Sequence, residues 1–444
     1  MRDLLPEEAA GFDRLFAVVM ARATRYGYPR IVTPIAEDRE VFLRSAGETS
    51  DTAGKEMYDV VLHGQTGLAL RPEGTAPVVR AYLEHAQHLV PQPVRLFYWE
   101  PMFRGQRPQK LRYRQFWQWG LELFGAGEPA ADVEIIEFTN GLLADVGLTD
   151  QVLKVNTIGD SASRAKVKAA LVEYFTKYRD ELDDDCKQRL DGSVLRIFDC
   201  KNPKDRKIAE GAPKIRELVS DEDRAHFSEV TAGLERLGIR YEIDDRKVRG
   251  FDYYTRTVFE FILTDPEFTQ GGDISVAGGG RYDGLVRTMG GPDRPGTGVA
   301  GGVDVLYFAL KQQGVKIDES VNADVYVLSG DPDDGADRIQ LATPLREAGF
   351  RVAIDYSKRS LDKQLESAVK HGAKVAVIRG TEESRGGKVI VRDLVAKEQR
   401  VTRLAAVVVE VGRHVPKRRK PRLIDEPSSA GAAGETPFLT DPRD

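Results

Sequence analysis

The chain has little cysteine. Cys186 and Cys200 are the only two among 444 residues, and the run between them shows none of the usual spacings of metal ligands. We therefore expect neither a disulfide framework nor a zinc site, and we predict no metal ligands. So low a cysteine content is typical of proteins in a reducing cytoplasm.

Long apolar runs are also absent. No segment reaches the length of about 18 apolar residues that a membrane helix needs. The charged start MRDLLPEEAAGF lacks the apolar stretch of a secretory signal peptide. With 41% apolar residues, 30% charged residues and a net charge of −5, the chain reads as a soluble cytoplasmic protein with no membrane partner. This charge argues against indiscriminate coating of nucleic acid but permits a local basic track.

The most informative stretch is residues 96–125, LFYWEPMFRGQRPQKLRYRQFWQWGLELFG. Phe97, Trp99 and Phe103 recur with a period of two, and the run from Tyr113 to Leu123 alternates in the same way. This periodicity predicts two strands joined by a loop.

The two faces of the second run differ in character. One face would carry Arg112, Arg114, Phe116, Gln118, Gly120 and Glu122, and the other Tyr113, Trp117, Trp119 and Leu121. The aromatic face has the residue types of a packed core. The polar face would bury charge at a cost unless it lines a cleft or meets a charged ligand, and a solvated, salt-bridged hairpin is the alternative. Five basic residues and no acid lie between Arg104 and Arg114, which suits phosphate binding.

The wording PMFRGQRPQKLRYRQF resembles motif 2 of class II aminoacyl-tRNA synthetases, and specifically that of histidyl-tRNA synthetases. The resemblance implies that two antiparallel strands hold the adenylate while their loop reaches the end of the tRNA. Arg104 then corresponds to the arginine that contacts the α-phosphate of ATP and the substrate carboxylate. Gln118 and Glu122 correspond to residues that grip the histidine. Gln106 departs from the pattern, because a glutamate that contacts the adenine amino group often stands there.

The N-terminal region predicts a helix and a strand. Residues 7–24 place apolar side chains at helical intervals, namely Phe12, Leu15, Phe16, Val19 and Met20. A strand is expected from Ile31 to Ile35, at an edge or an interface because Pro34 cannot donate to a ladder. The segment resembles motif 1, whose proline lies at the homodimer interface, so the resemblance implies a homodimer.

Glu73 stands at an expected junction between a strand and a helix, in LALRPEGTAPVV. Thr75 is predicted to cap the helix that begins near Pro77. A carboxylate at this place either binds an ammonium group or stabilises the helix dipole. The wording RPEGTA resembles that of the histidyl enzymes, which implies that Glu73, Gly74 and Thr75 bind the substrate, the glutamate and threonine at its α-amino group.

A second signature is RKVRGFDYYTRTVFEFIL, whose alternating end predicts a buried strand. A buried Arg249 needs a partner, either an adenylate phosphate or Asp252. The wording resembles a signature of histidyl-tRNA synthetases, which gives Arg249 the substrate carboxylate and α-phosphate, and Tyr253 and Tyr254 the histidine pocket. Neutral imidazole has one donor and one acceptor, so Glu122 as acceptor and Tyr254 as donor would match it.

The glycine-rich stretch AGGGRYDGL resembles the second histidine signature, which lines the substrate pocket; tight strand packing is the other explanation of its glycines. The segment after it occupies the place of motif 3. It reads Asp304-Val305-Leu306 where Glu-Arg-Leu is usual, so the arginine that grips the γ-phosphate is absent. Three other arginines are candidates to replace it: Arg281, Arg287 and Arg294.

The remaining segments predict the domain organisation. Residues 179–238 are highly charged with few aromatics, as in the helical insertion that faces the tRNA acceptor arm in this family. From Ala323 strands alternate with helices, which predicts an α/β domain with a mostly parallel sheet. Up to Arg400 it resembles the anticodon-binding domain of the histidyl, glycyl, threonyl and prolyl enzymes. Six Lys/Arg between Arg413 and Arg422 open a disordered tail, either inert or a mobile basic arm.

We therefore predict an α+β catalytic domain with the antiparallel class II synthetase sheet over residues 1–320, and a helical insertion within it at about 179–238. A C-terminal α/β anticodon-binding domain follows over 322–410, and a basic tail over 411–444. The resemblance implies a histidine–tRNA ligase that uses ATP with Mg²⁺, L-histidine and tRNA(His). One alternative is a non-catalytic paralogue that senses histidine or tRNA, which the departures at Gln106 and in motif 3 favour. The regulatory subunit of ATP phosphoribosyltransferase shares the fold but usually lacks the C-terminal domain.

Overall fold

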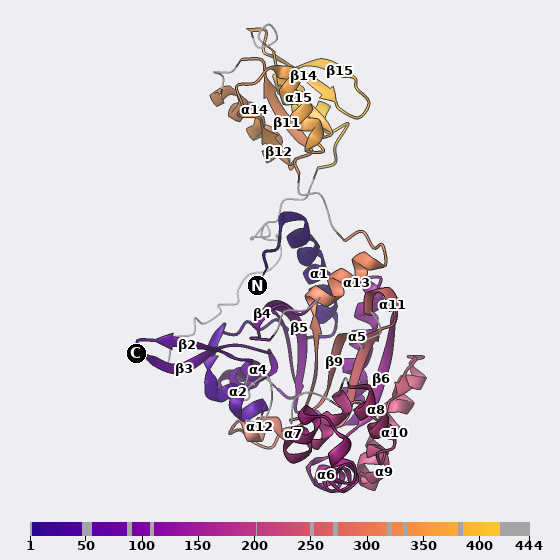
Figure 1. Cartoon of the computed structure of the whole chain (residues 1–444). Helices are drawn as coiled ribbons and strands as arrows, with labels where there is room; N and C mark the ends of the chain where they lie inside the picture. The colour runs from indigo at the N-terminus through magenta and orange to yellow at the C-terminus, as the bar shows by residue number, and fades with distance from the viewer. Residues whose placement is uncertain are drawn as a thin grey trace. The chain divides into compact units, whose positions relative to one another are not determined.

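The computed structural model describes residues 2–46, 56–86, 91–106, 111–200, 202–248, 253–269, 274–317, 322–331, 335–380 and 385–417. The chain divides into two compact units, Met1–Glu319 and Ser320–Asp444, and Figure 1 shows the elements of each. Among these described residues, no helix combines the length and the apolar character that crossing a membrane requires. The predicted tail falls outside the described residues from residue 418 onward.

A seven-stranded sheet forms the centre of the first unit, in the order β4-β5-β10-β9-β8-β6-β7. Its strands are β4 (Val94–Phe103), β5 (Gln115–Phe124), β6 (Gln151–Thr157), β7 (Glu242–Ile243), β8 (Thr255–Leu263), β9 (Ser275–Arg281) and β10 (Gly296–Gly302). Neighbours are antiparallel except for the short parallel pair β6 and β7. The predicted antiparallel sheet is confirmed.

Four helices complete the core of the first unit together with this sheet. They are α1 (Pro6–Arg25), α5 (Pro129–Asp145), α10 (Asp221–Arg236) and α13 (Val303–Gln312). Helix α1 begins with a proline in its first turn and buries Phe12, Leu15 and Val19, as their spacing predicts. Met20, expected on the same face, is 42% exposed. Helix α10 packs against this core although its sequence lies inside the predicted insertion.

A smaller three-stranded sheet lies near the start of the chain, in the order β1 (Ala36–Asp38), β3 (Gln65–Leu70), β2 (Tyr58–Leu62). Short helices accompany the two sheets, namely α2 (Arg39–Ala46), α4 (Thr75–Ala81), η1 (Tyr82–Ala86), α11 (Pro266–Thr269) and α12 (Leu285–Thr288). The strand expected from Ile31 to Ile35 is wrong. Only one bridge forms, Arg30 with Phe97, because Pro34 has no N–H with which to extend a ladder.

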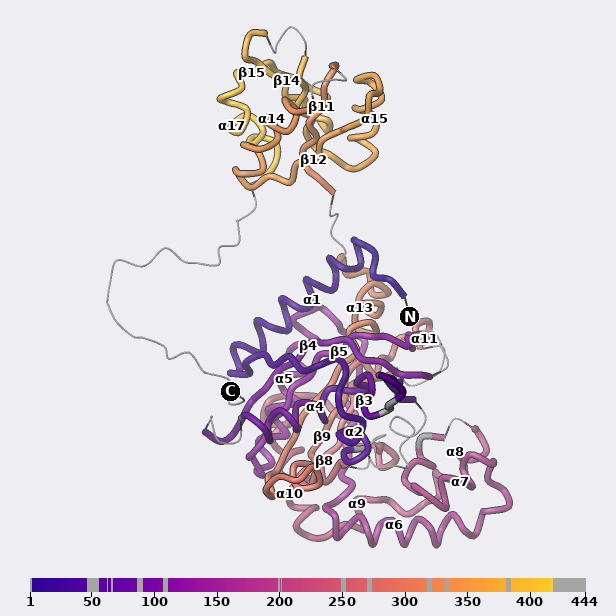
Figure 2. The backbone as a smooth tube through the Cα atoms, turned by 90° about the vertical axis from the view of Figure 1, so that its left-hand side faces the viewer, coloured from indigo at the N-terminus to yellow at the C-terminus, as the bar shows by residue number. Residues whose placement is uncertain are grey.

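The remaining helices of the first unit gather at one end of it, as Figures 1 and 2 both show. They are α6 (Ser161–Thr176), η2 (Arg179–Glu181), α7 (Asp184–Gly192), η3 (Val194–Asp199), α8 (Pro203–Glu210) and α9 (Ile215–Leu218). Asp160 caps α6 by accepting a hydrogen bond from the Ser163 backbone N–H at 2.7 Å. A second apolar core, which includes Leu171, Phe175 and Ile197, holds these helices together.

The second unit is a five-stranded sheet in the order β12 (Val352–Ile354), β11 (Val325–Ser329), β13 (Val375–Arg379), β14 (Lys388–Asp393), β15 (Gln399–Arg403). Its helices are α14 (Gly335–Glu347), α15 (Leu361–Lys370), η4 (Leu404–Ala406) and α17 (Val407–Val411). The α/β prediction is confirmed, but β14 and β15 are antiparallel to their neighbours. The prediction of a mostly parallel sheet is therefore wrong for β14 and β15. The connections that lead to these two strands are too short for the crossover that a parallel pair requires.

Candidate active site

Strands β4 and β5 carry the candidate site on one face and the core on the other. They pair along their whole length with Trp99 opposite Trp119. Trp119 and Leu121 are fully buried in the main core, as their alternation predicts. Gln118 and Glu122 occupy the opposite face of β5, so the polar face lines a buried site rather than a solvated surface.

Glu122 lies on this polar face near the C-terminal end of β5 and is 1% exposed. One carboxylate oxygen accepts a hydrogen bond from Thr75 Oγ1 at 2.7 Å, and the other accepts one from the hydroxyl of Tyr282. Burial raises the pKa of Glu122 to about 8, and the two hydroxyl donors only partly oppose this effect. At neutral pH the unliganded site therefore favours a proton on this carboxyl group.

Glycines make the space in which these side chains lie. Gly298 on β10 is paired with Glu122 across the sheet, and a Cβ atom there would overlap a carboxylate oxygen of that residue. A Cβ atom at Gly74 would lie 2.5 Å from the ring of Tyr98, and one at Gly120 would overlap the same ring. The buried Tyr98 thus occupies the gap that these two glycines leave.

Glu73 closes the N-terminal end of α4. Its carboxylate accepts hydrogen bonds from the backbone N–H groups of Thr75 at 2.6 Å and Ala76 at 2.9 Å. The prediction that Thr75 caps this helix is therefore wrong: the helix already begins at Thr75, and the threonine hydroxyl donates to Glu122 instead. Burial raises the pKa of Glu73, although both backbone donors oppose the shift.

A buried ion pair fixes the turn that presents Glu73. The guanidinium of Arg71 pairs with Glu100 on β4, and both residues are 2% exposed. The same guanidinium donates to the carbonyl oxygens of Thr33 at 2.7 Å and Pro101 at 2.9 Å. Glu100 in turn accepts from the backbone N–H of Thr33 at 2.8 Å. Three segments that are distant in sequence are thus tied together beside the candidate site.

Arg104 follows directly after β4 and points back toward the same turn. Its Nε donates to the carbonyl oxygen of Pro72 at 2.9 Å, and its guanidinium lies 5.1 Å from the centre of the Phe116 ring. Burial lowers its pKa, and the carboxylates of Glu56 and Glu73 act against that shift. Arg104 forms no ion pair with any residue that the structure describes. A half-buried guanidinium without such a partner is suited to an anionic ligand.

Aromatic rings border the site on the side of β8 and β9. The ring of Tyr253 lies 4.7 Å from that of Tyr254 and 5.8 Å from that of Tyr282. Tyr254 and Tyr282 are buried. The predicted Arg249 and its possible partner Asp252 fall outside the described residues.

Gln118, four residues before Glu122 on the same strand, completes the set of predicted residues. Its side-chain oxygen is buried and has no hydrogen-bond partner among the described residues. A buried acceptor without a donor is costly unless a ligand supplies one.

Arg281 does not replace the arginine that motif 3 lacks. That side chain is fully buried and pairs with Asp132 at 2.9 Å and Asp283 at 3.0 Å, which leaves it committed to the fold. Arg287 lies at the surface and pairs with Asp293, and Arg294 is also exposed. Asp304 is buried and accepts from the Trp117 backbone N–H at 2.9 Å.

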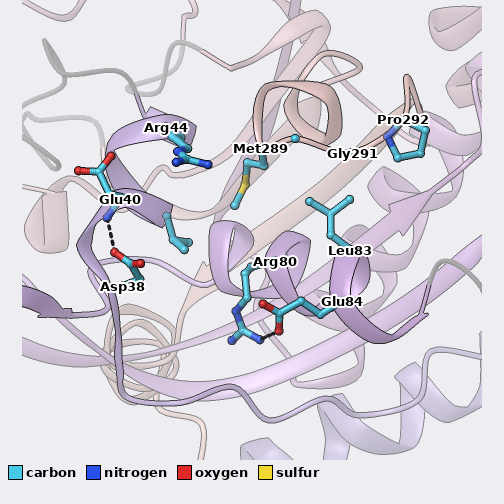
Figure 3. A pocket seen from close by; sticks show the side chains of 11 residues that line it. Asp38, Glu40, Arg44, Arg80, Leu83, Glu84, Met289, Gly291 and Pro292 are labelled. Carbon is cyan, nitrogen blue, oxygen red and sulfur yellow. Dashed lines mark hydrogen bonds and ion pairs between the residues drawn. The ribbon is translucent and has the colours of Figure 1, made fainter. Parts of the chain in front are cut away.

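A separate cavity of about 480 Å³ lies between α2, α4 with η1, and the turn after α12 (Figure 3). None of the predicted site residues lines it. Arg80 on its wall pairs with Glu37 at 2.6 Å and with Glu84 at 3.1 Å. We therefore place the candidate site at the polar face of β5 and not in this cavity.

Comparison with known families decides what kind of protein presents this site. The family model described as "Histidyl-tRNA synthetase" matches residues 1–306, and the one described as "Anticodon binding domain" matches residues 324–413. This chain belongs to the histidyl-tRNA synthetase family. The second match runs beyond Arg400, where the sequence resemblance was expected to end, and α17 accounts for the difference because it packs into the core of the second unit.

Relatives match over nearly the whole chain. The histidine–tRNA ligase of Lactococcus lactis is 40% identical over 407 residues, which cover 91% of this chain and 94% of the relative. That of Rhodospirillum rubrum is 42% identical over 408 residues, covering 91% and 95%. The crystal structure of apo S. aureus histidyl-tRNA synthetase is similar with a TM-score of 0.76 and 34% identity, covering 92% of this chain and 97% of that chain.

Two residues of this candidate site are not singled out by the sequence. Tyr282 lies inside the quoted AGGGRYDGL, and its hydroxyl bonds Glu122. Tyr98 stands on β4 within the aromatic hairpin, opposite Gly120. The available signal was the pairing of large aromatics with glycines, but the register that brings them together is not visible in the sequence.

Proposed function

We propose that this chain is a catalytic histidyl-tRNA synthetase, which activates L-histidine with ATP and transfers the histidyl group to tRNA(His), releasing AMP and diphosphate. One observation carries the proposal. Glu73 comes from one stretch and Arg104 and Glu122 from another, and the three converge on one buried polar site, in a chain whose relatives over 91% of its length are histidine–tRNA ligases.

The buried carboxyl groups of Glu73 and Glu122 bind the histidine. Each oxygen of Glu73 accepts one backbone N–H and keeps a further lone pair, so the carboxylate can also accept from the α-ammonium of histidine, beside Thr75. Glu122 faces the imidazole as acceptor, and Tyr254 supplies the donor. Gln118 gains a partner for its buried oxygen. An analogue without these imidazole nitrogens would leave buried polar atoms unpaired, which can cost roughly 10⁴-fold in discrimination.

Two arginines, Arg104 and Arg249, act on the α-phosphate of ATP. The carboxylate of histidine attacks the α-phosphorus of ATP, diphosphate leaves, and histidyl adenylate forms; a ribose hydroxyl of the terminal tRNA nucleotide then attacks the carbonyl carbon and AMP leaves. Mg²⁺ enters with ATP on its β- and γ-phosphates, as part of that substrate. Arg104 stabilises the charge on the α-phosphate, and by family resemblance Arg249 does the same. No side chain acts as a covalent nucleophile, since positioning and electrostatic stabilisation suffice.

Histidine-dependent exchange of ATP with labelled pyrophosphate tests the proposal. We expect exchange in the unmodified chain, a loss of about 10²- to 10³-fold in Arg104→Ala, and none above background in Glu122→Ala. Arg25→Ala is the matched control, because its side chain is 63% exposed and pairs at the surface. Absence of exchange in the unmodified, folded chain would refute the catalytic proposal. Unchanged histidine affinity in Glu122→Ala would show that the pocket is misassigned.

A histidine or tRNA sensor without ligase activity is the second candidate. The observation in its favour is Val305, which stands where the family has the arginine for the γ-phosphate. One charged contact of this kind is worth roughly 1.5–3 kcal/mol, so its loss weakens activation without touching histidine recognition. A chain that binds histidine in a calorimeter but shows no exchange would be such a sensor.

We further propose that the chain works as a cytoplasmic homodimer. Val32 is 69% exposed and Ile35 is 48% exposed, on either side of Pro34 in the segment that resembles motif 1. Paired apolar side chains of this size favour burial against a second copy. Light scattering after gel filtration should give a dimer, and Val32→Asp should shift it toward the monomer. A monomer in the unmodified chain would contradict the proposal.

The domain assignments follow the same logic. We propose that residues 1–320 form the catalytic domain, with the insertion at 179–238 directed at the acceptor arm, and that residues 322–410 bind the anticodon arm of tRNA(His). Residues 411–444 would form a basic tail. Deletion of the chain after residue 321 should keep pyrophosphate exchange and weaken aminoacylation of tRNA; full aminoacylation by the shortened chain would refute the assignment of the second domain.

A further inference from the structure

Four potential metal ligands meet among the helices of the first unit, far along the chain from the residues of the candidate active site. They are the carboxylates of Asp183 and Asp205 and the thiols of Cys186 and Cys200, and one ligand atom from each lies within 4.8 Å of all the others. Both cysteines are buried and unpaired in disulfides. The linear spacing of the cysteines did not indicate this cluster, because the carboxylates complete it.

Helix ends bring the four groups together. Asp183 caps α7 and accepts a hydrogen bond from the backbone N–H of Cys186 at 2.7 Å. The short helix η3 then turns the chain back, so that Cys200 arrives beside the same cap. Asp205 lies in the first turn of α8, and its carboxylate accepts from the backbone N–H of Asp183 at 3.3 Å. The arrangement is thus built into the packing of three helices.

Among the described residues, no cation balances the charges of the cluster. Neither Asp183 nor Asp205 forms an ion pair with a residue that the structure describes. Asp205 is 0% exposed, and its Oδ1 has no hydrogen-bond partner within the same described residues. A buried carboxylate without a cation is costly, so a bound cation is the direct way to neutralise it.

Two distances between ligand atoms of the cluster are close to those around a tetrahedral ion. Cys200 Sγ lies 3.5 Å from Asp205 Oδ2 and 3.9 Å from Asp183 Oδ2. Zinc bonds of about 2.3 Å to sulfur and 2.0–2.2 Å to oxygen place neighbouring ligand atoms about 3.4–3.8 Å apart. Mixed thiolate and carboxylate ligands favour a metal of intermediate hardness over Mg²⁺ or Ca²⁺.

We propose that Asp183, Cys186, Cys200 and Asp205 bind one zinc-class divalent cation, which fastens α7, η3 and α8 to one another. All four coordination positions are filled by protein, as in structural rather than catalytic zinc sites. The two competing explanations are a metal-free network of S–H···O hydrogen bonds and a disulfide between the two cysteines. This proposal does not depend on the activity of the enzyme.

The test uses the full chain without a polyhistidine tag, loaded with ZnCl₂ and desalted. We expect about one zinc per chain by elemental analysis, and after exchange to Co²⁺ the thiolate charge-transfer and tetrahedral d–d absorption bands. Cys200→Ser and Asp205→Asn should each retain at least tenfold less metal. Asp184→Asn is the matched control and should retain it fully, since that neighbouring carboxylate has a 96% exposed side chain.

Each other outcome overturns the proposal. Less than about one tenth of a zinc per unmodified chain, or a cobalt spectrum without thiolate bands, would leave the hydrogen-bonded network. Two thiols that fail to react in denatured, unreduced protein would establish the disulfide. Because the cobalt spectrum is measured on the unmodified chain, the test stays decisive even where a variant does not fold.

Discussion

Replacing Glu122 by glutamine measures the electrostatics of the proposed histidine pocket. In the folded chain burial raises the pKa of this carboxyl group from its ordinary value of 4.5 to about 8. Below pH 4.5 both the folded and the unfolded chain hold the proton, so the group costs nothing. Between pH 4.5 and 8 the unfolded chain has released a proton that the folded chain keeps, and the free energy of unfolding falls by about 1.4 kcal/mol per pH unit.

The expected total is large enough to measure. Over the interval from 4.5 to 8 the loss sums to about 5 kcal/mol, reached in full once pH passes the folded pKa. Glutamine cannot ionise, so this loss disappears in Glu122→Gln. The variant gives up one acceptor for the two hydroxyl donors, Thr75 and Tyr282, at a pH-independent cost of about 1 kcal/mol. The variant should therefore be the less stable protein at pH 5 and the more stable one at pH 8.

Urea unfolding followed by tryptophan fluorescence provides the assay. All three tryptophans of the chain, Trp99, Trp117 and Trp119, lie on β4 and β5, so the signal reports the sheet that carries Glu122. Glu128→Gln is the control, since that residue is exposed. If the stability difference between the unmodified chain and Glu122→Gln stays constant from pH 5 to 8, the reasoning about this carboxyl group is refuted.

Three further substitutions probe other parts of the site. Gly298→Ala places a Cβ atom against the carboxylate of Glu122 and should cost about 1–3 kcal/mol of stability and weaken histidine binding; calorimetric titration with an unchanged dissociation constant would contradict this. Val305→Arg should restore the γ-phosphate contact and lower the KM for ATP in pyrophosphate exchange about tenfold or more, a result that an unaltered KM would exclude. Arg281→Met removes the arginine that pairs with the fully buried Asp132, which then keeps only its contact with His226, and should cost about 3–5 kcal/mol in urea unfolding, so a loss below about 1 kcal/mol would show that the ion pair is dispensable.

Local periodicity made part of this structure predictable. The alternation in residues 96–125 correctly indicated two strands and separated the core face of Trp119 and Leu121 from the polar face of Glu122. The apolar spacing of α1 was equally informative, apart from Met20. These features depend on residues a few positions apart, whose relation the sequence displays directly.

Features that depend on pairing between distant segments were not predictable. The bond from Tyr282 to Glu122 requires the register of β5, β10 and β9, and the cluster at Cys186 requires three helix ends to meet. The short connections around β14 decided strand direction against the parallel prediction. At Thr75 the capping rule identified the right helix end but the wrong capping residue, because Glu73 and not Thr75 accepts hydrogen bonds from the first backbone N–H groups of the helix.

The Arg71 side chain connects the segment proposed to form the dimer interface with the turn that presents Glu73. It grips Thr33, between the exposed Val32 and Ile35, while its own backbone runs straight into Glu73. In the proposed dimer, contact of the second subunit with Val32 would therefore also affect the position of Glu73, the proposed partner of the substrate amino group. Dimer formation and histidine binding are then coupled through Arg71, and we expect a monomer to bind histidine more weakly than the dimer does.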